Sequence, residues 1–362
     1  MKQKLSVAPT LKNYDKKNLP KDILAGIIIM AVSIPISMGY AQISGLPAVY
    51  GLYGSVFPII LFALFSTSPQ FIFGVDAAPA ALVGAAVLGM GIEAGSKEAM
   101  TVVPVFTFFV ALWLLAFYFM NAGKLVNYIS APVMGGFITG ICTTIILMQA
   151  PKLMGSAAGT GELFELSEHI WEALHHINAA ALVMGIVALA ILVVSKRLVP
   201  KFPMAVVLMV TGALFTYFGP VKEWGVPTLS AVEPGMPRWY IPDFEAVFSV
   251  QKASEVIVLS LSVAVVIMAE TLLAENSFAQ KNRYRIDDNQ EILAFAMGNL
   301  AASVIGCCPV NGSVSRTAMG EQYQAKTQLT GIVAGLSMIV LLLCGTGFIG
   351  YPVPQSNNTI ID

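Results

Sequence analysis

Between two long apolar runs the chain reads Cys307-Cys308-Pro309-Val310-Asn311-Gly312-Ser313-Val314-Ser315-Arg316-Thr317. Pro309 removes a backbone donor, so the apolar segment breaks there and resumes as a polar helix. Asn311 is a favourable N-cap, and we expect the helix to begin at Gly312 and Ser313. The N-terminus of such a half-helix carries unpaired N–H groups and partial positive charge, to which Arg316 adds a full charge. The stretch predicts half of an anion site; a polar surface loop after an ordinary helix is the alternative.

The composition is that of a membrane protein. Of the 362 residues, 56% are hydrophobic and 11% are charged, whereas soluble domains carry about 25% charged residues. Uncharged runs such as Ile23–Met38, Ala179–Val194 and Val256–Ala269 are typical of membrane-spanning helices. We therefore expect an all-α polytopic membrane protein. The net charge of −1 says nothing about a nucleic-acid partner, since the basic residues lie in loops. The four cysteines lie in apolar segments without metal-ligand spacing, so neither a disulfide nor a metal site is expected.

The apolar pattern predicts a series of segments along the chain. They lie at roughly 22–43, 48–66, 70–93 (broken), 101–121, 130–150, 178–196, 203–219, 251–275, 289–307, 311–324 (a short helix) and 327–349. With the third and tenth as re-entrant half-helices, fourteen Lys and Arg residues lie on the side of the N-terminus and five on the other side. This excess predicts a cytoplasmic N-terminus, preceded by a basic leader over residues 1–21.

A counterpart to the opening stretch lies in the first half of the chain. Phe71–Ala80 again contains a short extended apolar run, a break, and a helix start at Asp76 and Ala77. Asp76 suits the N-cap position of that helix. Interrupted segments at corresponding positions of two halves point to inverted repeats and to a binding site near the bilayer midplane. We therefore expect the two half-helix N-termini to face one another.

The connection over residues 152–177 is acidic and is expected on the outer side. It contains His169, His175 and His176, which suggest a metal site as one interpretation. A solvated amphipathic loop helix is the interpretation that we favour, so no metal ligand is predicted there.

Two further motifs point to a known family. Ile34-Pro35-Ile36-Ser37-Met38-Gly39-Tyr40-Ala41 precedes Leu46-Pro47-Ala48-Val49-Tyr50-Gly51-Leu52-Tyr53-Gly54, and Gly312–Arg316 precedes Lys326-Thr327-Gln328-Leu329-Thr330-Gly331. Over roughly residues 20–350 the chain resembles the SulP anion transporters, called SLC26 in animals. The resemblance implies a seven-plus-seven inverted repeat, with two half-helices preceded by short extended strands, and elevator-like motion of a core domain against a gate domain. Residues 22–121 and 251–350 would be core, and residues 122–250 the first half of the gate.

The resemblance also implies site residues. Ser315 and Arg316 match the family's serine–arginine pair, and Tyr40 matches an aromatic position that lines the pocket. Glu270 matches a carboxylate position that in bacterial relatives is tied to a coupling cation. The expected anion-site residues are Tyr40, Asp76, Ala77, Asn311, Ser313, Ser315 and Arg316, and those expected for the coupling ion are Glu270 and Asp76.

Glu270 also stands out without the resemblance. It follows a long uncharged run, and a carboxylate within a membrane helix is costly unless it is paired or hydrated. Glu270 could be protonated, bind Na⁺ or form an ion pair with Arg316. The alternative is that it lies near the cytoplasmic interface. Glu275, five residues on, is expected at that interface.

The chain departs from the family in three respects. Ile36 stands where the family often has glutamine, and Asp76 stands where relatives carry an uncharged residue. A carboxylate at a half-helix start repels an anion unless it is protonated or holds a cation, which favours H⁺ or Na⁺ coupling. A complete relative would continue with three further gate helices and usually a soluble STAS domain, whereas residues 351–362 form a polar tail. We therefore expect a sequence truncated after about the eleventh segment.

These observations predict a secondary active transporter of a small inorganic or carboxylate anion, coupled to H⁺ or Na⁺. We expect it in the lipid bilayer of a bacterial-type inner (plasma) membrane, with no other cofactor and no nucleic-acid partner; whether it is a homodimer stays open. The sequence shows no arrangement of a nucleophile and a base, so we do not expect an enzyme. The alternatives are a nucleobase permease of the same fold and a non-transporting fragment that acts as a membrane scaffold.

Overall fold

The computed structural model describes residues 7–12, 14–124, 131–156, 163–199, 202, 204–221, 223–226, 235–237, 239, 241–249 and 253–344. The predicted polar tail over 351–362 and the first six residues of the leader lie outside this part. The helices and strands, in chain order, are α1 (Leu19–Ile43), α2 (Val49–Tyr53), α3 (Phe57–Phe65), β1 (Phe73–Gly74), α4 (Ala77–Gly89), α5 (Lys97–Phe119), α6 (Ala131–Leu153), α7 (Leu163–His175), α8 (Ala179–Leu198), α9 (Met204–Phe218), α10 (Phe244–Ser249), α11 (Ala253–Asn282), α12 (Asp288–Val304), β2 (Asn311–Gly312), α13 (Val314–Gln322) and α14 (Leu329–Cys344).

Several of these helices have the dimensions of membrane spans. In the described part of the chain, three are long and apolar enough to cross a bilayer: Lys16–Ile43, Lys97–Phe119 and Ala253–Asn282. A fourth results if α7 and α8, which meet at an angle of 115°, are taken as one span. The second predicted segment, 48–66, is divided between α2 and α3.

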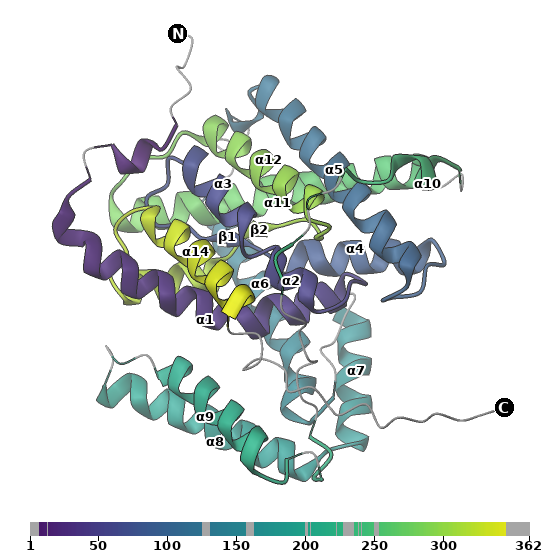
Figure 1. Cartoon of the computed structure of the whole chain (residues 1–362), viewed down its shortest axis with the longest axis vertical. Coiled ribbons are helices and arrows are strands. Elements are labelled where there is room, and N and C mark those ends of the chain that lie inside the picture. The colour runs from purple at the N-terminus through teal and green to yellow at the C-terminus, as the bar shows by residue number, and fades with distance from the viewer. Residues whose placement is uncertain are drawn as a thin grey trace.

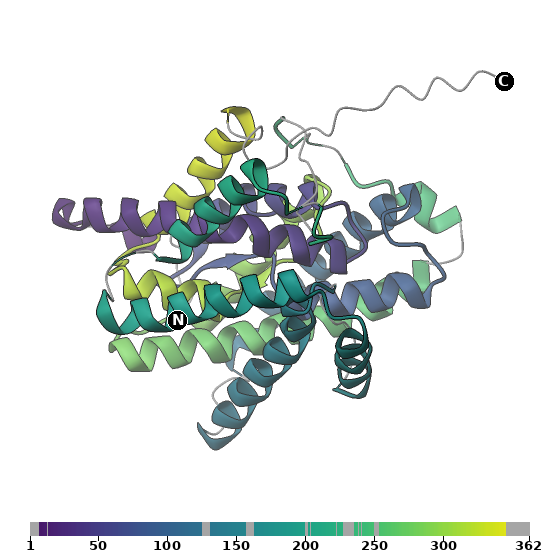
Figure 2. The ribbon, with the colours of Figure 1, turned by 90° about the horizontal axis from the view of Figure 1, so that it is seen from below.

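The first five helices and the last four pack into one body (Figures 1 and 2). α12 packs against α5 and α3, α1 packs against α14, and α11 packs against α5. A stack of phenylalanines anchors β1 within this body. The ring of Phe73 lies 4.7 Å from that of Phe62 on α3 and 5.6 Å from that of Phe295 on α12, and all three side chains are buried. Such stacked aromatic pairs add to the gain from burying apolar area, so β1 has a defined position in the core.

The two interrupted segments meet at the centre of this body. β1 and β2 pair antiparallel, with Phe73 opposite Gly312 and Gly74 opposite Asn311. Each strand leads into a half-helix, β1 into α4 and β2 into α13. The prediction that residues 70–80 and 307–317 lie together is confirmed.

The predicted start of the second half-helix is wrong. Asn311 lies in β2, Ser313 is the N-cap, and α13 begins at Val314. The reason is that the Asn311 side chain bonds to Glu270 and Thr271 of α11 and is not free to cap a helix turn.

A second group of helices lies beside the main body. α6 packs against α7 and α8, α8 packs against α9, and α9 contacts α1. Figure 1 shows α8 and α9 as a separate layer in teal. The amphipathic helix expected in the acidic connection is α7.

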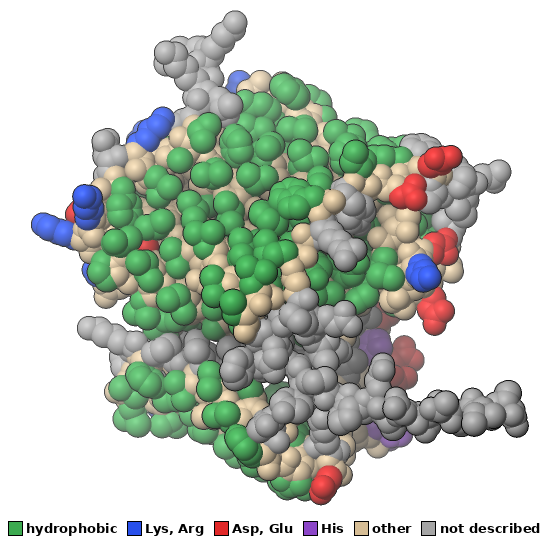
Figure 3. Space-filling model, in the orientation of Figure 1, with side chains coloured by type: hydrophobic (Ala, Val, Ile, Leu, Met, Phe, Trp, Pro, Cys, Tyr) green, Lys and Arg blue, Asp and Glu red, His purple; other side chains and the backbone are tan. Residues whose placement is uncertain are grey.

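The surface is consistent with a lipid environment. Large apolar side chains are exposed on α1 and α14, among them Leu24, Ile27, Leu336 and Val340. Figure 3 shows a broad hydrophobic face, with Lys and Arg gathered at its left margin and mostly Asp and Glu at its right margin. Exposed apolar area of this extent is unusual for a soluble monomer and is expected where the solvent is lipid.

Candidate substrate site where the two half-helices meet

Arg316 occupies the junction between the two half-helices. It lies in the first turn of α13, and its side chain is only 1% exposed. Nη2 donates to the carbonyl oxygen of Val75 at 2.7 Å and lies 3.5 Å from Oδ2 of Asp76, and Nη1 donates to Oγ of Ser33 at 3.4 Å. Gly74 permits this approach, because a Cβ there would lie 2.9 Å from Nη1. The guanidinium group therefore reaches from α13 to the start of α4 and to α1.

Asp76 occupies the N-terminus of the other half-helix. It is the N-cap of α4, as predicted, and its Oδ1 accepts a hydrogen bond from the N–H of Ala77 at 2.7 Å. Its Oδ2 faces Arg316. A carboxylate at this position is stabilised by the helix dipole. The positive end of α4 is therefore already occupied by a carboxylate of the chain itself.

The N-terminus of α13 is different. Ser313 is its N-cap residue but makes no side-chain bond to the first turn; its Oγ lies 3.3 Å from Oγ of Ser315 instead. Ser313 is buried, whereas Ser315 is exposed. The first N–H groups of an α-helix have no acceptor within the helix. The start of α13 therefore offers N–H groups, two hydroxyls and the charge of Arg316 to an anion.

Glu270 is joined to this junction through Asn311. Its carboxylate is 7% exposed, and Oε2 accepts a hydrogen bond from Nδ2 of Asn311 at 2.8 Å. Thr271 donates a hydrogen bond to Oδ1 of Asn311. An ion pair between Glu270 and Arg316, one of the predicted arrangements, is not formed, because the carboxylate next to Arg316 is that of Asp76.

Tyr40 of α1 is a further residue at this junction. Its side chain is 8% exposed, and its hydroxyl interacts electrostatically with Asp76 and Arg316. It also bonds to the side chain of Gln149 on α6. All the predicted site residues thus lie around the starts of α4 and α13, and α6 contacts the same place from outside the main body.

The sequence interpretation missed three polar residues at this place. Ser33 precedes Tyr40 by seven residues, which is about two helical turns, so the spacing on α1 was a usable signal. Gln149 and Lys152 lie three residues apart at the end of the apolar run of α6 and so share a helix face. The Nζ of Lys152 lies 3.3 Å from where a Cβ on Gly39 would be. The side of the site facing α6 is therefore polar as well.

The structure adds one fact about Glu275, whose expected place at the cytoplasmic interface stays a prediction. Its side chain is completely buried beside α12. Helix α11 continues to Asn282, so residue 275 lies about two turns before its end. The length of the apolar run predicted a shorter helix than the structure has.

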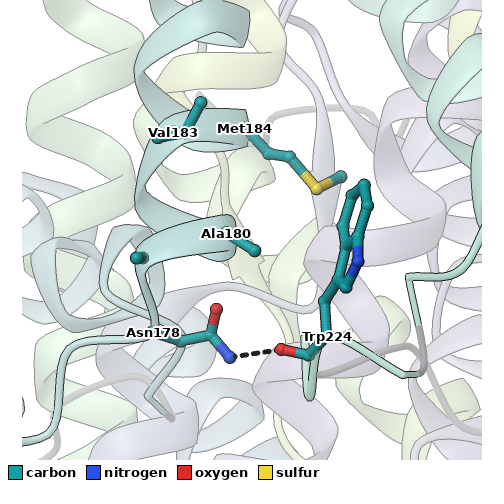
Figure 4. Close-up of a pocket in the computed structure, with 6 residues that line it drawn as sticks. Asn178, Ala180, Val183, Met184 and Trp224 are labelled. Carbon is teal, nitrogen blue, oxygen red and sulfur yellow. Dashed lines mark hydrogen bonds between the residues drawn. The ribbon is translucent and has the colours of Figure 1, made fainter.

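The cavity drawn in Figure 4 lies elsewhere, beside the start of α8. It has a volume of about 670 Å³ and is lined by Asn178, Ala179, Ala180, Val183, Met184 and Trp224. Nδ2 of Asn178 donates to the carbonyl oxygen of Trp224 at 2.9 Å. None of the predicted site residues lines it, so the half-helix junction remains the candidate substrate site.

Comparisons with known proteins identify the family of the sequence and relatives of the fold. The sequence model of the sulfate permease family matches residues 19–356. A probable sulfate transporter of Mycobacterium tuberculosis is 26% identical over 343 residues, covering 94% of this chain and 60% of that protein. The transmembrane domain of the cyanobacterial bicarbonate transporter BicA superposes with a TM-score of 0.74 at 18% identity, covering 93% of this chain and 86% of that one. The murine anion transporter Slc26a9 superposes with a TM-score of 0.77 at 22% identity, covering 94% and 59%.

These matches confirm the predicted fold, which is the helical transmembrane fold of BicA and Slc26a9. The chain spans about half to three-fifths of the length of the first curated relatives that it matches.

Proposed function

Because this chain belongs to the sulfate permease family, a family of membrane anion transporters and not of enzymes, we propose that it is the transmembrane part of a secondary active transporter of a small anion. Sulfate and bicarbonate are the anions named for its relatives, and a carboxylate-type anion has the same charge chemistry. The proposed coupling ion is H⁺ or Na⁺.

One observation carries this proposal, namely the buried guanidinium of Arg316 beside the uncapped N-terminus of α13. A buried charge is costly unless it is paired and hydrogen-bonded. Arg316 has three oxygen partners within hydrogen-bonding distance, but its Nε is without a protein acceptor. An oxyanion at the start of α13 would bind the remaining donors of both groups.

Asp76 supports coupling to a cation. It lies 3.5 Å from Arg316, so it competes with a substrate anion for the same positive charge. Protonation of Asp76, or a Na⁺ bound to it, would release Arg316 to the substrate. Glu270 is a second carboxylate within electrostatic reach of Asp76, so both would share the coupling ion.

Alternating access would follow from movement of the main body against α6–α9. Tyr40 lies in α1 and its partner Gln149 lies in α6, so a contact at the site joins the two groups of helices. The excess of basic residues on one side favours a cytoplasmic N-terminus in a bacterial-type inner membrane.

The test is transport by the purified protein in liposomes. Uptake of labelled sulfate, bicarbonate and uracil is measured under imposed H⁺ or Na⁺ gradients, for the unmodified chain and for Arg316→Ala. Arg285→Ala is the matched control, because Arg285 is an exposed arginine between α11 and α12. Anion uptake that Arg316→Ala removes and Arg285→Ala retains supports the proposal. Uptake of uracil alone would favour a nucleobase permease, and folded protein that binds no anion would favour a membrane scaffold.

A further inference from the structure

Two carboxyl groups lie together between α11 and α12, away from the candidate substrate site. Glu275 of α11 and Glu291 of α12 are both 0% exposed, and their side chains interact. The two helices also pack here through Nδ2 of Asn276, which donates to Oδ1 of Asp288 at 2.9 Å. Glu275 lies five residues after Glu270, which is about 7.5 Å along the helix and about 140° around it. The pair is therefore separate from the anion site.

Only one of the two carboxylate oxygens of Glu291 receives hydrogen bonds. Its Oε1 accepts from the N–H of Thr67 at 2.5 Å, from the N–H of Ser68 at 3.1 Å, and from the hydroxyl of Thr67. Its Oε2 is buried and has no hydrogen-bond partner in the structure. The connection after α3 thus supplies donors to Oε1 of Glu291 and none to Oε2.

Glu275 has no donor at either oxygen. Both Oε1 and Oε2 are buried and without a hydrogen-bond partner. A fully buried carboxylate in this condition is strongly disfavoured, and a neighbouring carboxylate makes it more so. A hydrogen bond between two carboxyl groups requires that one of them carries a proton.

Within the described part of the chain, the charged groups that act on Glu275 are the carboxyls of Glu291 and Asp288, and neither is positive. Asp288 of α12 adds to the negative field at Glu275. Tyr284, in the connection between the helices, bonds to Ser68, and burial raises its pKa to about 12, so it is a neutral hydroxyl. Lys281, near the end of α11, is engaged with Glu321 at 2.6 Å.

We propose that Glu275 and Glu291 form a proton-binding site, in which protonated Glu275 donates a hydrogen bond to Oε2 of Glu291. The proton comes from solvent, and no bond other than O–H is made. One proton gives partners to two of the three unpaired oxygen atoms, because the protonated oxygen of Glu275 gains an acceptor and Oε2 of Glu291 gains a donor. It also removes one of two adjacent negative charges. The site does not depend on which solute the chain transports.

A proton fits this pair better than a metal ion does. Ca²⁺ and Mg²⁺ require about six or more oxygen ligands, whereas Oε1 of Glu291 is already used by Thr67 and Ser68. The described residues contain no group of three or more His, Cys, Asp or Glu that could hold a metal ion.

The pair links stability to pH with a definite sign. In the folded protein the proton stays bound at neutral pH, whereas the unfolded chain releases it above the ordinary carboxyl range of about pH 4.3. The folded state then binds more protons than the unfolded state, so stability falls as pH rises. Glu275→Gln removes this dependence, because the amide cannot ionise and its N–H replaces the O–H donor.

The test combines infrared spectroscopy with thermal unfolding of the solubilised full chain. The unmodified protein should absorb as a protonated carboxylic acid at neutral pH, and Glu275→Gln should lose the part of that absorption that comes from this pair. The melting temperature of Glu275→Gln should change less with pH between mildly acidic and mildly alkaline buffers. Glu255→Gln, an exposed position on the same helix, should behave as the unmodified chain.

A second variant covers the case in which Glu275→Gln does not fold. In Glu291→Gln the new amide donates to an ionised Glu275, so the pair's part of the acid absorption at neutral pH should again be lost. The proposal is overturned if the unmodified protein shows no carboxylic-acid absorption at neutral pH. It is equally overturned if either folded variant retains all of the carboxylic-acid absorption. A third outcome would also overturn it: added Na⁺, and not acid, raises the melting temperature of the unmodified protein, and Glu275→Gln abolishes this rise.

Discussion

Asp76 and Arg316 are 240 positions apart in the chain, yet Oδ2 of Asp76 lies 3.5 Å from Nη2 of Arg316. The pairing of β1 with β2 brings the starts of α4 and α13 together and so makes this contact. It has two consequences for an anion. The contact fixes the positive charge of Arg316 at the junction. The carboxylate of Asp76 also competes with the anion for that charge.

The first prediction concerns the positive charge. Arg316→Ala should weaken anion binding about tenfold to a hundredfold, since a hydrogen bond to a charged group is worth about 1.5–3 kcal/mol. The anion affinity of Arg316→Lys should lie between those of the unmodified chain and Arg316→Ala, because lysine keeps the charge but lacks the planar guanidinium group. Titration of the purified protein with sulfate or bicarbonate measures this. Unchanged affinity in a folded Arg316→Ala variant would remove Arg316 from the site, and Arg285→Ala shows the effect of losing an exposed arginine.

The second prediction concerns the competing carboxylate. Asp76→Asn should tighten anion binding about two- to fivefold, since a partly exposed ion pair contributes up to about 1 kcal/mol. Asparagine caps a helix about as well as aspartate, so α4 should stay intact. The same titration applies, with Glu93→Gln as a control that removes an exposed negative charge between α4 and α5. Weaker binding in Asp76→Asn would contradict the competition.

The third prediction concerns the coupling ion. Glu270→Gln should make anion uptake independent of an imposed H⁺ or Na⁺ gradient, because the amide can neither titrate nor attract a cation. Its oxygen can still accept from Nδ2 of Asn311, so the junction should keep its form. Uptake into liposomes with and without each gradient is the measurement. Coupling equal to that of the unmodified chain would count against Glu270, and Glu255→Gln on the same helix is the control.

The fourth prediction tests the packing of α2 on α1. A Cβ on Gly51 would lie 1.9 Å from the carbonyl oxygen of Ser37, which is backbone and cannot turn aside. Gly51→Ala should therefore destabilise the fold by about 1–3 kcal/mol. Gly89→Ala is the matched control, because nothing lies within 4 Å of a Cβ there, and it should be neutral or slightly stabilising. Thermal unfolding compares the two, and equal melting temperatures would show that the α1–α2 contact is looser than described.

The sequence interpretation was most successful where hydrophobic pattern and chain breaks decide the structure. The apolar runs correspond to helices, and the two interrupted segments lie together at one junction, as their matching positions in the two halves predict. Asp76 is the N-cap of α4 because a short acidic side chain before an apolar helix satisfies its first N–H groups. The assignment of helices to core and gate domains stays a prediction, as do the coupling ion and the homodimer.

The interpretation failed where a side chain chooses between local and distant partners. Asn311 is as good an N-cap as Asp76 by local rules, but Glu270 and Thr271 of α11 take its amide, and the cap moves to Ser313. The predicted segment ends at Glu275, but α11 continues beyond it to Asn282 and α12 covers the Glu275 side chain. No local signal distinguishes these cases, because the competing partner lies on another helix.

By itself, the amino-acid sequence determined that this chain is a helical membrane protein with two interrupted segments, since both properties follow from local hydrophobicity and backbone chemistry. Only the tertiary structure decided which polar groups share the junction. It placed Asp76 next to Arg316, Asn311 next to Glu270, and Glu275 next to Glu291. The physical reason is that the energy of a buried charge depends on the donors and charges within a few ångströms, and helix packing supplies these from distant parts of the chain.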